Sequence, residues 1–153
     1  MKYIDESSLL LCKYQAGLFE YATIDKKINS ANFIKAFSFS DLSKRIDDEA
    51  FIYDSLSIAA AFDELKKEKI LRSTGKTYPA QVMSWIGYLM RYWSILYSVS
   101  TITIYKTIKP NELYNLYESY HSLDIEVAIN RILEAKNKYK SLNDIDLFRK
   151  IYL

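Results

Sequence analysis

A nearly uninterrupted apolar stretch, residues 79–97, constrains the fold of this chain more than any other part of its sequence. It holds both tryptophans, three tyrosines and a single charged residue, Arg91. Plotted at about 100° per residue, the stretch places apolar side chains on almost every side of a helix, which is typical of a helix buried in a protein core. We therefore predict a central buried helix over residues 79–97, with the rest of the chain packed around it.

One narrow strip of this helix differs from the rest, because it carries small side chains and the only charge. Its members are Ser84, Gly87, Arg91 and Ser94. We expect Gly87, together with Gly17 on the first predicted helix, to mark the point where the two helices cross. A buried guanidinium must be paired, since an isolated buried charge costs several kcal/mol. We expect a carboxylate opposite Arg91, either from a partner or from this chain, where Glu20 is the candidate.

The same region is long enough to cross a bilayer, because residues 82–104 carry one charge over 23 residues. Against a membrane span, Arg91 near the middle would cost roughly 3 kcal/mol. Serines and threonines dilute the hydrophobicity, and the tyrosines are not banded at the two ends. We predict a core helix that ends near Ser98, and no membrane partner.

Composition favours a single helical domain. The 153 residues are half hydrophobic, with three glycines and two prolines, so there is enough chain for a sizeable core but little turn chemistry for an all-β fold. Apolar spacing and helix-start residues predict further helices over residues 6–22, 30–39, 53–70, 101–108, 110–120 and 144–153, with shorter turns after Ser40 and a helix after Asp124. We predict an all-α bundle of six or seven short helices forming one domain, 1–153, in which the last helix, 144–153, needs docking to be stable.

Charge and cysteine content exclude several classes of protein. The net charge of +2 gives no general steering toward nucleic acid. The only cysteine, Cys12, cannot form an internal disulfide, so a reducing cytoplasm is the natural compartment. One Cys and one His cannot build a zinc site of the usual kind, and we predict no metal and no cofactor.

A local basic cluster is interpreted as a solvated face, with a phosphate backbone or an acidic partner as the alternatives. It comprises Lys66, Lys67, Lys69, Arg72 and Lys76.

Catalytic machinery is sparse. The only histidine, His121, follows a predicted helix, where an imidazole commonly bonds the last carbonyls, although it is also the one candidate general base. Cys12 lies on an apolar helix face, and we predict that it is a small buried apolar side chain. Gly75-Lys76-Thr77 ends like a phosphate-binding loop, but the glycine required five residues earlier is Ile70. We predict that the protein is not an enzyme.

The sequence contains five short motifs, Trp85-Ile86-Gly87-Tyr88, Arg91-Tyr92-Trp93, Ile104-Tyr105-Lys106, His121-Ser122-Leu123-Asp124 and Ala128-Ile129. Together they resemble a pattern found in small uncharacterised bacterial proteins of toxin–antitoxin operons. In those proteins a segment like Trp-x-Gly-Tyr-x-x-Arg-Tyr-Trp precedes Ser-Ser-Lys-Glu-Ile-Tyr-Lys and a Tyr-x-x-x-His-Thr-x-Asp turn. The resemblance covers about residues 82–132. The chain departs from it at residues 101–103, where the pattern has more polar residues.

The resemblance implies an antitoxin-like or immunity-like protein that neutralises a cognate toxin by direct contact. The residues that it implies for partner binding are Arg91, Tyr92 and His121, followed by Tyr88 and Tyr105. Structural roles are expected for Trp85, Gly87, Trp93, Gly17 and Glu20. The alternatives are a DNA-binding autoregulator and a small enzyme using His121; a homodimer is also compatible with the sequence. Residues 110–120 contain no Lys or Arg, which disfavours a recognition helix there.

Overall fold

The computed structural model describes residues 2–48, 51 and 55–137 of the chain, and the helix predicted over 144–153 lies outside these ranges. The fold is all-α, as predicted, and the described residues contain no strand. The labelled helices are α1 (Glu6–Tyr21), α2 (Ser30–Ser38), α3 (Asp41–Asp47), α4 (Ile58–Glu68), α5 (Ala80–Tyr97), α6 (Thr101–Thr107) and α7 (Pro110–Tyr120). Residues 125–137 form one further helix.

Side-chain caps set most of the helix starts. Asp5 accepts a hydrogen bond from the Ser8 amide at 2.8 Å, and Ser100 accepts one from the Thr103 amide at 3.1 Å. Each cap satisfies an amide that has no partner within its helix. Pro110 occupies the first turn of α7, where a missing amide proton costs nothing. These local signals explain why most predicted helix starts agree with the structure. The helix predicted over 53–70 is the exception, because α4 begins only at Ile58, where Ser57 accepts a hydrogen bond from the Ala60 amide at 3.1 Å.

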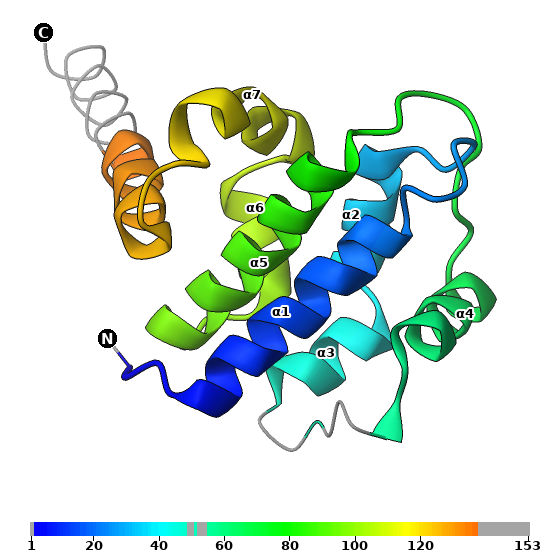
Figure 1. Cartoon of the computed structure of the whole chain (residues 1–153), viewed down its shortest axis with the longest axis horizontal. Helices are drawn as coiled ribbons and strands as arrows, with labels where there is room; N and C mark the ends of the chain where they lie inside the picture. The colour runs from blue at the N-terminus through cyan, green and yellow to red at the C-terminus, as the bar shows by residue number, and fades with distance from the viewer. Residues whose placement is uncertain (1, 49–50, 52–54, 138–153) are drawn as a thin grey trace, which may run out of the picture.

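The long helices α1 and α5 lie side by side and run antiparallel through the middle of the molecule (Figure 1). The Lys2 amide donates to the Leu96 carbonyl at 2.8 Å, and Gln15 Nε2 donates to the Gly87 carbonyl at 3.0 Å. A β-carbon on Gly87 would lie 2.8 Å from both the Gln15 carbonyl oxygen and the Phe19 ring. The prediction that Gly87 marks a close helix crossing is therefore confirmed.

Gly17 does not belong to the same crossing, so the prediction that it faces α5 was wrong. A β-carbon on Gly17 would lie 2.6 Å from Cδ1 of Ile58, at the first residue of α4. The two glycines of the helix pair face different neighbours. Helix α1 is thus held between α5 on one side and α4 on another.

Helix α5 is the centre of the bundle, as predicted from its composition. Ten of its 18 residues are buried, including Trp93, so most of its circumference is covered by other elements. One continuous hydrophobic core contains buried side chains from every helix described. The helix ends where Ser98 adopts a left-handed backbone with φ of 53°. In the part of the chain described here, none of the helices combines the length and apolar character needed to cross a bilayer.

The helix over residues 125–137 packs back onto α5 and α7 (Figure 1). Ala128, Ile129 and Ile132 are its buried side chains. The Tyr97 hydroxyl is hydrogen bonded to Oδ1 of Asn130, and Lys136 forms an ion pair with Glu112 at 2.6 Å. This packing fixes the short connection that follows α7 and carries His121.

Candidate functional site

The only charge of the central helix, Arg91, lies inside the protein with 1% of its surface exposed. Its Nη1 donates to Oδ1 of Asp47 at 2.7 Å, its Nε to Oε1 of Gln15 at 2.8 Å, and its Nη2 to Oγ1 of Thr101 at 3.0 Å. The carboxylate opposite Arg91 is thus supplied by this chain. It comes from Asp47 at the end of α3, and the candidate Glu20 was wrong; its side chain is exposed on α1.

The carboxylate of Asp47 is itself held in place. It accepts hydrogen bonds from the Thr101 hydroxyl at 2.6 Å and from the Thr101 amide at 3.1 Å, at the first residue of α6. Burial lowers the pKa of Arg91, and the nearby Asp47 charge opposes that shift. No buried side-chain nitrogen or oxygen among the described residues lacks a hydrogen-bond partner.

A cavity of about 620 Å³ opens beside this network, and both Arg91 and Asp47 contribute to its lining. All three guanidinium nitrogens already donate to protein acceptors. The network therefore joins four helices, and in this fold Arg91 does not present its charge to a partner, the role that the resemblance implies for it.

A second group of conspicuous side chains gathers on the surface between α5 and α7, and we call it the aromatic face. It comprises Trp85, Tyr88, Tyr92, Tyr117 and His121. The Tyr88 and Tyr92 rings stack at 6.2 Å, and the Trp85 and Tyr117 rings meet edge to face at 5.7 Å. The four larger rings are half-buried and His121 is exposed, which leaves part of each available to a partner.

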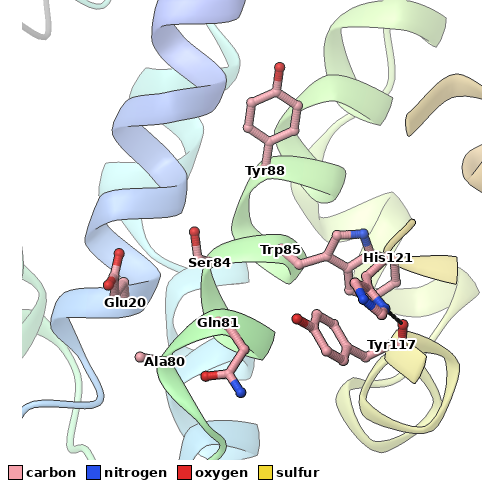
Figure 2. A pocket seen from close by; sticks show the side chains of 8 residues that line it. All are labelled: Glu20, Ala80, Gln81, Ser84, Trp85, Tyr88, Tyr117 and His121. Carbon is pink, nitrogen blue, oxygen red and sulfur yellow. Dashed lines mark hydrogen bonds between the residues drawn. The ribbon is translucent and has the colours of Figure 1, made fainter. Parts of the chain in front are cut away.

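An open pocket of about 550 Å³ runs along the aromatic face (Figure 2). Figure 2 shows Glu20 of α1 on one side of the pocket, across from Ser84, and Trp85 with His121 on the α7 side. Glu20 thus belongs to this surface. The pocket carries one carboxylate and several ring faces, a combination that suits a cationic or amphipathic side chain.

Acidic residues border the hydroxyl end of the aromatic face. Burial is the main cause that raises the pKa of both Tyr88 and Tyr92, and the Asp124 carboxylate raises the pKa of both further. Glu126 adds to the shift at Tyr92. These carboxylates lie at and just after the start of the helix over residues 125–137, so the packing of that helix places negative charge beside the rings.

The His121 imidazole is stacked on Tyr117 at 4.3 Å, and its Nδ1 lies 2.7 Å from the Tyr117 carbonyl oxygen. This is the bond to a helix-end carbonyl expected from its position after α7. With Nδ1 as the donor, the exposed Nε2 remains as an acceptor. Cys12 is completely buried, and burial raises the pKa of its thiol to about 12, so it is a poor nucleophile in the folded protein.

No group of three or more potential metal ligands occurs among the residues described. Of the five residues singled out for partner binding, Tyr88, Tyr92 and His121 come together. Tyr105 lies apart on α6, where it packs edge to face on Phe39 at 5.5 Å. Sequence reasoning missed Tyr117, although its spacing of four residues from His121 was a usable signal for a helical neighbour.

Comparison of the chain with protein-family models, with curated proteins and with solved structures finds no match.

Proposed function

We propose that this protein is a non-enzymatic binding partner of the antitoxin or immunity type, which neutralises a cognate bacterial toxin in the cytoplasm by direct contact. The observation that supports the proposal is the convergence of Tyr88, Tyr92 and His121 on one surface. These residues come from separate parts of the pattern that resembles toxin–antitoxin proteins. The fold gathers them on one half-exposed face that has no bonded catalytic pair.

The aromatic face has the chemistry of a protein-binding hot spot. Tyrosine and tryptophan supply large contact areas with few rotatable bonds, and they dominate the energetics of many interfaces. The rings of Trp85 and Tyr88 are already held by contacts within the fold, so little side-chain entropy is lost on binding. Partner contact through this face would cover the pocket between Glu20 and His121.

Co-expression with the product of the neighbouring open reading frame tests this function. We expect that product to arrest growth alone, growth to recover with this protein, and the two chains to purify together. The double variant Tyr88→Ala/Tyr92→Ala is expected to weaken the complex by roughly a hundredfold or more, because each ring is an anchor. Tyr3→Ala is the matched control, since Tyr3 is 85% exposed and lies outside the pocket.

Thermal unfolding of each variant separates lost binding from lost folding. Because Tyr88 and Tyr92 are only half-buried, the double variant should stay folded. A neighbouring product that neither arrests growth nor forms a complex would contradict the proposal. An intact complex with the folded double variant would remove the aromatic face from it.

A further inference from the structure

One end of the molecule, made by the α1–α2 connection, α4 and the segment over residues 69–77, carries a surface that the proposed function does not use. We call it the basic end. Its cations are Lys26, Lys27, Lys66, Lys67, Lys69, Arg72 and Lys76. None of the seven forms a salt bridge with another described residue, and all except the half-buried Lys69 are exposed.

Backbone pairing joins the segments that carry these cations. The Asn29 amide donates to the Arg72 carbonyl at 2.9 Å, and the Ser30 amide donates to the Lys76 carbonyl at 3.0 Å. The Thr77 hydroxyl oxygen lies 2.6 Å from the Ile28 carbonyl oxygen and 2.9 Å from the Lys26 carbonyl oxygen, both in the α1–α2 connection. In Figure 1 the two connections run together along the same edge of the molecule as α4. The seven cations therefore lie along one edge, where they outnumber the four carboxylates of the same elements, Asp25, Asp63, Glu64 and Glu68.

Apolar side chains project from the same edge. Ile70 is 90% exposed and Ile24 is 72% exposed, and they are the most exposed aliphatic side chains of the described residues. A small pocket of about 320 Å³ lies between Ile24 and Leu71, with Lys27 and Lys66 also in its lining. Lys76 lies over the Tyr114 ring at 3.8 Å and Lys66 over the Phe62 ring at 5.7 Å, but no described carboxylate pairs with either ammonium group. Exposed isoleucines among cations without a salt bridge favour a partner that is both anionic and apolar.

We infer that the basic end docks on an anionic lipid bilayer surface. Lysine ammonium groups would contact lipid phosphates, while Ile24 and Ile70 would enter the boundary between headgroups and acyl chains. Such contact needs no membrane-spanning helix, so it is a different interaction from the span that the sequence argued against. It does, however, revise the expectation of no membrane partner.

Charge and composition favour a bilayer over the other anionic partners. A nucleic acid would neutralise the cations through its phosphates but would leave both isoleucines in water. Protein interfaces are depleted in lysine and enriched in arginine and aromatic residues. The basic end has six lysines, one arginine and two exposed isoleucines, with no exposed ring.

Co-sedimentation of the full chain with lipid vesicles tests the inference. We expect binding to vesicles of equal parts phosphatidylglycerol and phosphatidylcholine, none to phosphatidylcholine alone, and a decline with added salt. The double variant Lys69→Gln/Arg72→Gln should bind vesicles more weakly by a factor of about ten or more. The variant Ile70→Ser should also weaken binding. The control Lys13→Gln/Lys106→Gln removes the same charge from exposed positions on α1 and α6 and should bind normally.

Three results would overturn the inference. They are an absence of binding to phosphatidylglycerol vesicles at low salt, equal binding to phosphatidylcholine vesicles, and equal losses in the basic-end and control variants. A short DNA duplex is included as a competitor. Retention of the duplex without vesicle binding would assign the surface to nucleic acid instead. Because the altered side chains are exposed, apart from the half-buried Lys69, circular dichroism should show every variant folded.

Discussion

Arg91 is a charged residue in the middle of an apolar helix, and its surroundings are polar only where its guanidinium reaches. Asp47, Gln15 and Thr101 accept its hydrogen bonds from three other helices. Such an arrangement contributes less to stability than its Coulomb attraction implies, because both charges have lost their water. Its larger effect is the cost of breaking it, which leaves one charge buried and alone.

Asp47→Ala is expected to lower the free energy of unfolding by about 3–5 kcal/mol, because it leaves the Arg91 guanidinium unpaired. Urea denaturation measures the loss. The double variant Asp47→Ala/Arg91→Met should lose clearly less than the sum of the two single variants, since it removes both charges. Glu20→Ala is the control and should change stability by no more than about 0.5 kcal/mol. Additive losses would show that the two residues are not coupled.

The need for a buried partner of Arg91 was predictable from the sequence, but the identity of that partner was not. Asp47 is followed by Asp48 and Glu49, and three adjacent acidic residues predict a solvent-exposed loop or helix start. Nothing local distinguishes the one carboxylate that turns inward, because its partner is 44 residues away. On α1, the side chain that reaches Arg91 is the uncharged Gln15, a choice that charge pairing alone does not reveal.

Cys12 should make stability depend on pH above the neutral range. Its pKa is raised by burial from 9.0 to about 12, so the folded state keeps the thiol proton while the unfolded chain releases it. The stabilisation is complete below about pH 9 and is lost as pH rises toward about 12. Urea midpoints at about pH 8 and pH 10.5 should differ less in Cys12→Ala than in the parent.

At the scale of elements, the contact between α1 and α5 is the most extensive in the bundle. It depends on Gly87, because a larger residue would collide with the α1 backbone at the Gln15 carbonyl. Gly17 faces only the flexible tip of Ile58. A methyl group at Gly87 would therefore have to displace backbone atoms, whereas one at Gly17 would displace only the end of a side chain.

Gly87→Ala should lower the free energy of unfolding by about 1–3 kcal/mol, because backbone atoms must move apart. Gly17→Ala is its matched control. It should be close to neutral, since Ile58 can turn aside and alanine favours the helix by about 1 kcal/mol. Thermal unfolding of the two variants compares them directly. Equal losses would contradict the assignment of the close crossing to Gly87.

Helix positions were largely predictable because their signals are local. Asp5, Ser100 and Pro110 start their helices where capping and proline geometry predict. The neighbours of each helix were harder to predict, as Gly17 shows, because helical spacing reports a small face without saying what covers it. The aromatic face shows the same limit, since Tyr88 and His121 were predicted separately and Tyr117, on which His121 stacks, was missed.

At the scale of the whole molecule, the aromatic face and the basic end occupy different elements. The first uses α5 and α7, whereas the second centres on α4 and the segment over residues 69–77. In Figure 1, α4 lies at the opposite edge from the helix over residues 125–137. The two surfaces share no residue, although Lys76 of the basic end lies over the Tyr114 ring of α7, 3.8 Å from its centroid.

The two proposed interactions should be separable. Ile70→Ser is expected to weaken vesicle binding while the complex with the neighbouring gene product remains intact. Tyr88→Ala/Tyr92→Ala should do the opposite. Measuring both interactions for both variants checks this independence. A variant that loses both while remaining folded would show that one surface serves both partners.

The Arg91 network also has a consequence for how the protein unfolds. Its hydrogen bonds join residues that are separated in sequence by 44 positions in one case and 76 in the other. They can form only after two distant parts of the chain have come together, which costs loop-closure entropy. We expect the network to be absent from the folding transition state. Asp47→Ala should then raise the unfolding rate by roughly a hundredfold to a few thousandfold and leave refolding nearly unchanged in stopped-flow measurements. We therefore expect the Arg91 network to form after the folding transition state and to lengthen the lifetime of the native state by slowing unfolding.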